Sequence, residues 1–174
     1  KAIPKNTYLN LSAEKKQRII EASLNEFALR SYEEVKISNI IKEAKIARGS
    51  FYQYFIDKAD LYEYIFDLIA KEKMMFLGDI LPNTNDLPFL EIFHLLYRKG
   101  VEFAYTNPRY MEIGKHLFNL KGEMYDRLIG DGLKIAKQYY LGYIENDKLK
   151  GRIRDDVDSD VFADLVVRST SNIT

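Results

Sequence analysis

Cysteine and tryptophan are absent from this sequence of 174 residues, which has two histidines, four prolines and nine glycines. Without cysteine there can be no disulfide scaffold, thiolate nucleophile or thiolate metal site. The two histidines, His94 and His116, are too few for a three-histidine metal site. The small number of prolines and glycines favours helices over a loop-rich β-sandwich. We therefore expect neither a metal nor a cofactor.

Long apolar runs are also missing. No run reaches the roughly 18 residues that a membrane-spanning helix needs, and no signal peptide opens the chain, so we expect a soluble, cytoplasmic protein. The motifs GxSxG, GxxxxGK[ST] and HExxH do not occur. Nothing therefore places a nucleophile or a phosphate loop beside the acidic residues, and the sequence argues against an enzyme.

Charge is balanced overall but not along the chain. The sequence has 26 basic and 26 acidic residues, yet residues 1–60 hold 11 basic and 8 acidic ones, a charge of +3, and the remainder carries −3. A basic N-terminal third on an acidic body weakly favours an anionic partner at that end.

The spacing of apolar residues predicts an all-α protein. Ile20, Leu24 and Phe27 lie four and three residues apart, which is typical of one buried face of a helix, and Ser12 is suited to cap its start. The same pattern predicts helices over residues 12–30, 37–44, 47–54, 57–80, 88–105, 108–119, 122–146 and from about 159 onward. Residues 1–11 are polar and contain Pro4, so we expect a flexible arm there.

One segment carries functional information. Residues 36–58 (KISNIIKEAKIARGSFYQYFIDK) predict two short helices joined by a tight turn, the helix-turn-helix whose second helix enters the major groove of DNA. Arg48 has the fork of donors that suits guanine, and Gln53 can pair with adenine. Gly49 allows a close backbone approach, and Ser50 can donate to a phosphate.

The tyrosines and the last lysine of this segment extend the candidate surface. The hydroxyls of Tyr52 and Tyr54 can reach backbone oxygens of DNA, and Lys58 begins the next helix, where free N–H groups favour a phosphate. Taken singly, such charges are ordinary surface residues, and only their place in this segment favours DNA. The candidate DNA-contacting residues are Lys36, Ser38, Lys45, Arg48, Gly49, Ser50, Tyr52, Gln53, Tyr54 and Lys58.

The segment resembles the N-terminal domain of the tetracycline-repressor-like (TetR) family of regulators. The resemblance rests on residues 46–55 and 57–61, and upstream on residues 19–22 and 26–28, and it covers residues 12–62, about a third of the chain. Three positions depart from the family pattern, one of them near Lys36, where a threonine or serine that is common in the family is absent. Lys45 stands where the family usually has glycine, so a left-handed backbone there would carry a strain of about 1 kcal/mol, or the lysine adds a cation near a phosphate. Ala47 stands where serine or threonine is common.

This resemblance implies a ligand-responsive, sequence-specific transcription factor, usually a repressor. It would bind a palindromic operator in double-stranded DNA as a homodimer and release it when a small-molecule effector enters the C-terminal domain. The implied domains are the arm at 1–11, the three-helix DNA-binding domain at 12–57 and a helical ligand-binding and dimerisation domain at 58–174. Because the last helix ends without glycine or proline, we expect that third region to be incomplete at its C-terminus.

Two alternatives differ in their chemistry. A helical small-molecule-binding or adaptor protein could retain the helix-turn-helix as a structural piece. An all-α enzyme would need a buried polar cluster in the second domain. The aromatic residues there suit either a ligand pocket or an ordinary core, so no ligand-binding residue is identified.

Overall fold

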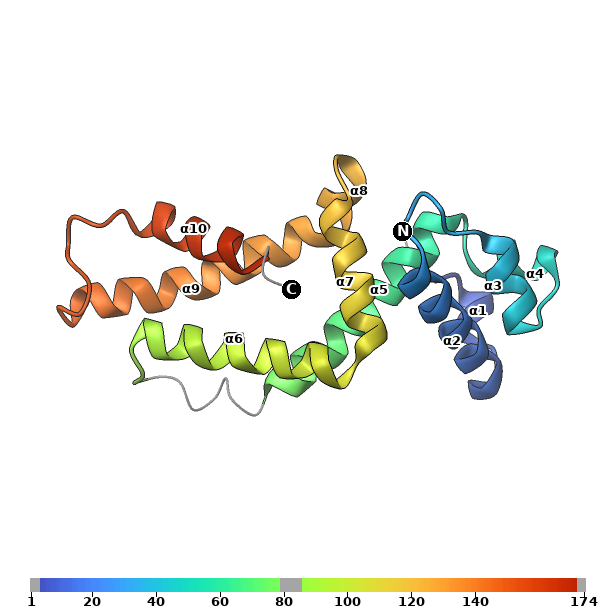
Figure 1. Cartoon of the computed structure of the whole chain (residues 1–174), viewed down its shortest axis with the longest axis horizontal. Coiled ribbons are helices and arrows are strands. Elements are labelled where there is room, and N and C mark those ends of the chain that lie inside the picture. Colours follow the sequence, from blue (N-terminus) through green and yellow to red (C-terminus); the bar gives the residue numbers. More distant parts are fainter. Residues whose placement is uncertain (1–3, 79–85, 172–174) are drawn as a thin grey trace. The chain divides into compact units, whose positions relative to one another are not determined.

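The computed structural model describes residues 4–78 and 86–171, and within them all regular structure is helical, with no strand (Figure 1). The prediction of an all-α protein is confirmed. The predicted helix end near Ile80 lies outside the described residues. The elements are Asn6–Leu9 (α1), Ala13–Leu29 (α2), Ile37–Ala44 (α3), Arg48–Tyr54 (α4), Lys58–Gly78 (α5), Phe89–Thr106 (α6), Pro108–Asn119 (α7), Glu123–Tyr125 (α8), the π-helix Asp126–Gly130 (η2), Asp131–Leu149 (α9) and Ser159–Ser171 (α10).

The chain folds into two compact units. The first contains α1 to α4, the part of α5 up to Glu72, and α7; the second contains the rest of α5, α6, α8, η2, α9 and α10. The predicted boundary between residues 57 and 58 stays a prediction. Since α7 packs on α2, the first unit joins segments that are distant in the sequence.

The first unit is built on α2. The Ser12 hydroxyl accepts the N–H of Lys15 at 3.3 Å, which confirms the cap predicted at the start of this helix. Ile19, Ala22 and Phe27 are buried on one face of α2. Removing this apolar face from water is the main force that holds α2 to its neighbours.

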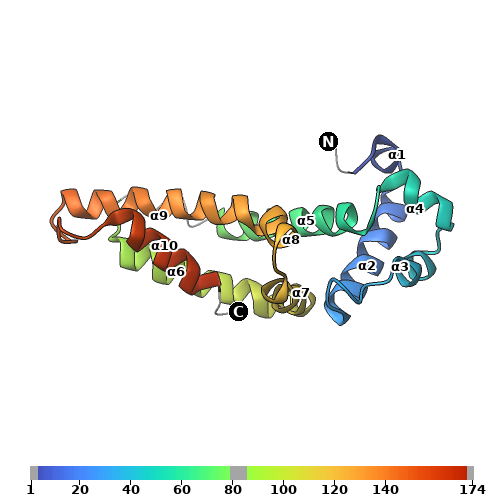
Figure 2. The same ribbon diagram turned by 90° about the horizontal axis from the view of Figure 1, so that it is seen from above.

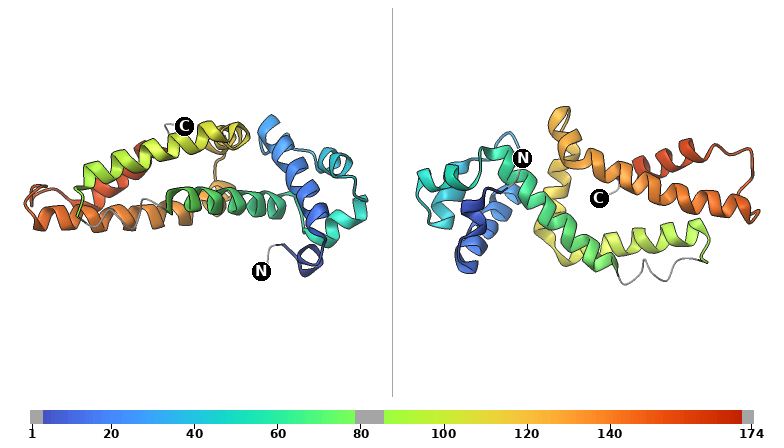
Figure 3. Two further views of the ribbon diagram at one scale, coloured as in Figure 1. Left: turned by 90° about the horizontal axis from the view of Figure 1, so that it is seen from below. Right: turned by 180° about the vertical axis from the view of Figure 1, so that it is seen from behind.

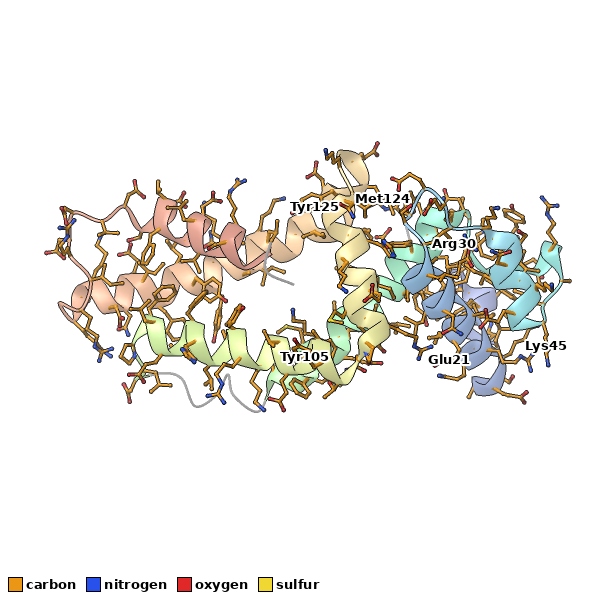
Figure 4. All side chains as sticks on the ribbon, viewed as in Figure 1. Glu21, Arg30, Lys45, Tyr105, Met124 and Tyr125 are labelled. Atoms are coloured by element: carbon orange, nitrogen blue, oxygen red, sulfur yellow. The ribbon has the colours of Figure 1, made fainter. Side chains whose placement is uncertain are left out.

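Polar contacts join α7 to α2. Arg109 of α7 donates to Glu21 at 2.6 Å and to Asn25 at 2.9 Å. Its hydrogen bond to Glu21, the residue labelled on α2 in Figure 4, raises the pKa of the Arg109 guanidinium. His116 of α7 lies 3.2 Å from the Ala28 carbonyl oxygen.

Part of the segment expected to be a flexible arm, residues 1–11, is helical, and its first three residues lie outside the described residues. Residues 6–9 form α1, which lies against α4 (Figures 2 and 3). Tyr8 is fully buried, with its ring centre 5.1 Å from that of Phe55. The polar composition of the segment concealed one aromatic anchor, Tyr8, whose burial helps to hold this short helix against α4.

The second unit has its own core. Phe89 of α6, Ile144 of α9 and Ala163 of α10 are buried together, and the Phe89 ring packs against Tyr140 and Phe162 with ring centres 5.8 and 5.5 Å away. Figures 1 and 2 show α9 and α10 side by side. Aromatic residues of this unit therefore fill a core.

The region predicted as one long helix over 122–146 is interrupted. It contains α8, the π-helix η2 over Asp126–Gly130, and then α9. A π-helical turn accommodates one additional residue without breaking the apolar spacing on either side, so periodicity did not reveal it. Figure 4 labels Met124 and Tyr125 at α8, directly before η2.

Candidate nucleic-acid interface

The turn between α3 and α4 has a left-handed residue. Lys45 has φ 54° and ψ 48°, so the turn does have the left-handed backbone whose strain was one of the two alternatives raised for this position. Its N–H donates to the Lys42 carbonyl at 3.3 Å, and the Ile46 N–H donates to the Ile41 carbonyl at 3.2 Å. These bonds end α3 in the manner of a left-handed cap. The Lys45 side chain is exposed at this turn (Figure 4).

Helix α4 has two distinct faces. Phe51 and Tyr54, three residues apart and therefore on one side, are buried, at 0% and 4% exposure. Ser50 is half-buried. The remaining candidates point outward, with Tyr52 at 46% exposure; the exposed residues of α4 are Arg48, Gly49, Tyr52 and Gln53.

Tyr54 packs inside the first unit. Its ring centre lies 6.1 Å from that of the buried Tyr8, and the Lys15 ammonium lies 5.6 Å above it. The helical period places position 54 on the same face as Phe51, so Tyr54 belongs to the core of the first unit. The expected contact of Tyr54 with DNA stays a prediction, and the burial of its ring counts against it.

Gly49 has space for a side chain inside the protein. No atom of the described chain lies within 4 Å of the place where its β-carbon would be. The folded chain therefore does not itself require glycine at this helical position. Close approach of a partner molecule gives a reason for it.

The start of α3 depends on a residue that the sequence did not single out. The Lys36 side chain cannot accept a hydrogen bond, and Glu26 of α2 accepts the Lys36 N–H at 3.0 Å instead. The same carboxylate accepts the Asn39 side-chain amide at 3.1 and 3.2 Å, and it lies 3.1 Å from the Arg30 guanidinium. An anion at this helix start is favoured by the free N–H groups and the helix dipole. Lys36 and Ser38 are exposed beside it.

A sequence signal for Glu26 did exist. It follows Ile19 by seven residues and Ala22 by four, which places a carboxylate on the buried face of α2. A carboxylate on an apolar stripe implies an internal partner, because burying an unpaired charge is costly. The partner itself could not be identified, since it comes from the next helix.

Lys58 is turned toward its own domain. Its ammonium lies 4.5 Å from the centre of the Tyr32 ring. It donates to the backbone carbonyls of the segment between α2 and α3, at Tyr32 (2.6 Å), Glu33 (3.4 Å) and Val35 (3.5 Å). This bonding ties the start of α5 to that segment. The phosphate contact expected of Lys58 stays a prediction.

Exposed positive charge is distributed along α3, the turn after it and the start of α4. The exposed cations of the two helices and their turn are Lys36, Lys42, Lys45 and Arg48. The exposed Glu43 accepts the Asn25 amide at 2.6 Å. A surface with a local excess of lysine and arginine beside outward-facing donors suits a phosphate backbone.

The second unit contains a half-open cavity of about 490 Å³, between α8, η2, α9 and α10. Apolar and charged groups share its wall, among them Tyr125, Leu133, Lys134, Lys137, Asp164 and Arg168. Hydrogen bonding to Asp160 raises the pKa of Lys137, and hydrogen bonding to Arg168 lowers that of Asp164. The volume is within the range of small-molecule sites.

Metal-binding clusters and membrane-spanning helices are both absent from the described residues. Within the described parts of the chain, no three histidine, cysteine, aspartate or glutamate residues come together as a metal site. Across residues 4–78 and 86–171, no helix has both the length and the apolar character to cross a bilayer.

Comparison with known proteins agrees with this geometry. Residues 19–65 match the family described as bacterial regulatory proteins, tetR family. The chain is 24% identical over 149 residues to an HTH-type transcriptional regulator, YhgD, of Bacillus subtilis, covering 86% of this chain and 72% of YhgD.

Solved structures extend the similarity to the second unit. The chain is 31% identical to a TetR family transcriptional regulator from Chloroflexus aurantiacus, with a TM-score of 0.72, covering 98% of this chain and 78% of that one. FadR from Bacillus subtilis, solved with stearoyl-CoA, is 18% identical with a TM-score of 0.69, over 90% and 83% of the two chains. Because these relatives are transcriptional regulators, the prediction that the chain is not an enzyme is confirmed. Because the family model matches its N-terminal region and the similarity to a solved TetR regulator extends over most of its length, this chain belongs to the TetR family of transcriptional regulators.

Proposed function

We propose that this regulator is a repressor that binds a palindromic operator in double-stranded DNA as a homodimer and releases it when a small-molecule effector binds. The observation that carries the proposal is the outward face of α4, where Arg48, Gly49 and Gln53 are exposed beside the buried Phe51. A helix that presents these donors, with the exposed Tyr52 beside them, suits the major groove. A repressor acts where the chromosome is, so we place it in the cytoplasm.

The test of DNA binding begins with a duplex selected by the chain from a random-sequence pool. Arg48→Ala should weaken binding to that duplex by about tenfold or more and relax its sequence preference, because a bidentate contact to guanine is lost. Fluorescence anisotropy at several salt concentrations measures both effects. Arg98→Ala removes the same charge from an exposed position of α6 and should change affinity less than about twofold. Equal affinities of the two variants would contradict the proposal.

Repression itself is tested by transcription in vitro. We expect the chain to stop transcription from a promoter that overlaps the selected duplex, and the Arg48→Ala variant to leave it running. Increased transcription in the presence of the chain would instead identify an activator.

The homodimer is supported by an exposed apolar face in the second unit. Val161 and Leu165 lie four residues apart on α10 and are 54% and 60% exposed, and Ile135 of α9 is also exposed. Such side chains suit a self-complementary contact with a second copy. Leu165→Glu should weaken dimerisation at least about tenfold in sedimentation equilibrium, because it places a charge in that contact. Leu149→Glu, at an exposed position at the end of α9, is the matched control and should leave it unchanged.

The effector is proposed to be an amphipathic anion that occupies the cavity of the second unit. Leu133 and Val167 offer an apolar surface. Lys134 pairs with Asp131 at 3.2 Å and Lys137 with Asp160 at 2.9 Å, so an acidic group of the effector would replace these internal partners. Stearoyl-CoA, present in the FadR structure, has this combination of an apolar chain and negative charge.

The test of the effector uses decanoate and its neutral methyl ester as probes. Decanoate should bind in calorimetry and lower the affinity for DNA, while the ester and the Lys137→Met variant should show at least about fivefold weaker binding. Equal binding of acid and ester would exclude an anionic effector.

A second candidate function is favoured by the inward bonding of Lys58. A helical small-molecule-binding or adaptor protein could use the helix-turn-helix as a structural piece, with Lys58 tying α5 to the segment before α3. It predicts ligand binding in the cavity with no salt-dependent affinity for DNA. The anisotropy measurement discriminates the two functions.

A further inference from the structure

The recognition helix α4 is short and meets another segment at its C-terminal end. It has seven residues, Arg48–Tyr54, and starts after Ala47, whose side chain has no capping oxygen. The last carbonyls of any helix have no partner within the helix. A helix this short forms only when its ends are supported from outside.

The N-terminal segment supplies three donors to three successive carbonyls of α4. The Lys5 ammonium donates to the Tyr52 carbonyl at 2.8 Å, and the Lys5 N–H donates to the Tyr54 carbonyl at 3.0 Å. The Thr7 hydroxyl donates to the carbonyl between them, that of Gln53. The ammonium also places positive charge at the negative end of the helix dipole.

The segment that supplies these donors is itself anchored on its C-terminal side. The Tyr8 ring lies within 5.1 Å of the Phe55 ring and 5.2 Å of the Tyr64 ring, centre to centre, and Tyr8 is fully buried. Beyond it, the Lys16 ammonium donates to the Leu9 carbonyl at 2.7 Å. The donors of Lys5 and Thr7 are therefore held in place before any partner binds.

We propose that residues 5–9 form a clamp that positions α4 for sequence recognition, with Lys5 and Thr7 as positioning residues. The clamp holds the carbonyls of Tyr52 and Gln53, the residues whose side chains face outward. A small tilt of a seven-residue helix would displace Arg48 and Gln53 relative to a base pair. This inference rests on the proposed function, because recognition of DNA is what the clamp would serve.

The test uses variants that remove the donors and keep the shapes. These are Lys5→Met, Thr7→Val and the double variant; Asn6→Ala, whose side chain is exposed between them, is the control. Hydrogen exchange of the α4 amides in the free protein should accelerate about fivefold for each single variant and more for the double variant, with no acceleration for Asn6→Ala. Circular dichroism confirms that each variant remains folded at the assay temperature.

Binding separates a positioning role from a purely structural one. With the selected duplex and a scrambled one, Thr7→Val should reduce the ratio of the two affinities about fivefold while the salt dependence stays unchanged, because no charge is removed. Unchanged exchange in α4, or faster exchange with an unchanged affinity ratio, overturns the clamp. A wild-type chain that binds neither duplex overturns the proposed function instead, so the two failures are distinguishable.

Discussion

The two compact units start a helix in the same way, with a carboxylate supplied by a different helix. In the first unit, Glu26 of α2 accepts the Lys36 N–H at the start of α3, at 3.0 Å. In the second unit, Asp147 of α9 accepts the Phe89 N–H at the start of α6, at 2.8 Å. Both carboxylates are buried, at 6% and 3% exposure. Each compensates for a helix start that has no capping side chain of its own.

The surroundings of the two carboxylates differ. Arg30 lies 3.1 Å from Glu26, and Arg152 donates to Asp147 at 3.0 Å. Lys36 is exposed, whereas the Phe89 side chain is buried in the core of the second unit. The hydrogen bond of the Lys36 N–H is partly buried and that of the Phe89 N–H is buried, so water reaches the start of α3 more easily than the start of α6. The same interaction therefore starts a helix near the surface in one unit and supports a core in the other.

Left-handed residues make a second contrast between the units. The second unit has glycine at both described positions of positive φ, Gly122 at 68° and Gly151 at 70°, whereas the first has Lys45 at 54°. Glycine adopts this conformation without cost, and lysine does not. Strain retained at the turn before α4 is consistent with a side chain kept for binding.

The largest expected effect is at Asp147. Asp147→Ala should lower the free energy of unfolding by about 3 kcal/mol, because it leaves the Phe89 N–H and the Arg152 guanidinium without their acceptor. Urea unfolding followed by circular dichroism measures the change. Asp155→Ala, at an exposed position, should stay within about 0.5 kcal/mol of wild type. A loss below about 1 kcal/mol at Asp147 would remove the contrast between the units.

Glu26→Ala should cost less, about 2 kcal/mol, because water reaches the freed Lys36 N–H. Glu26→Gln, which keeps an acceptor oxygen, should cost about 1 kcal/mol. Glu33→Ala is the exposed control. In urea unfolding, a loss at Glu26 equal to that at Asp147 would show that exposure near the helix start does not matter. Affinity for the selected duplex should fall with Glu26→Ala, since α3 then starts without its cap.

Gly151→Ala tests the positive φ of the second unit. No described atom lies within 4 Å of the added β-carbon, so the expected loss of about 1 kcal/mol comes from the backbone alone. Gly132→Ala, inside α9 with the same open space, should instead gain up to about 1 kcal/mol. Thermal unfolding of both variants gives the comparison, and shifts of the same sign would contradict it.

Lys45→Gly is expected to have the smallest effect and the opposite sign. It should raise the free energy of unfolding by about 0.5–1 kcal/mol in urea titration, because it relieves the left-handed lysine. If Lys45 contacts a phosphate, the salt dependence of DNA binding should fall by about one charge. Lys42→Met removes a charge from a helical position and should give no gain in stability. A destabilised Lys45→Gly variant would show that the left-handed lysine is not strained.

Much of the helical structure followed from the spacing of apolar residues. The apolar spacing between Ile37 and Ala44 predicted a helix there, and Pro108 predicted the start of another; the structure has both helices at these positions. The spacing did not predict the roles of single residues whose partners are distant in the sequence. From the sequence, Tyr8 is assigned to a polar arm and Tyr54 to the DNA-contacting surface. The aromatic cluster that buries both rings is assembled from α1, α4 and α5, and the sequence does not reveal that these helices meet.

The sequence by itself determined the helical class, the helix-turn-helix and its outward donors, because apolar periodicity and side-chain chemistry are local properties. The tertiary structure decided which polar side chains form hydrogen bonds within the protein. Glu26, Asp147, Lys5 and Lys58 each bond to backbone atoms far along the chain. Backbone N–H and carbonyl groups are the same in every residue, so only the folded chain selects which of them a side chain meets.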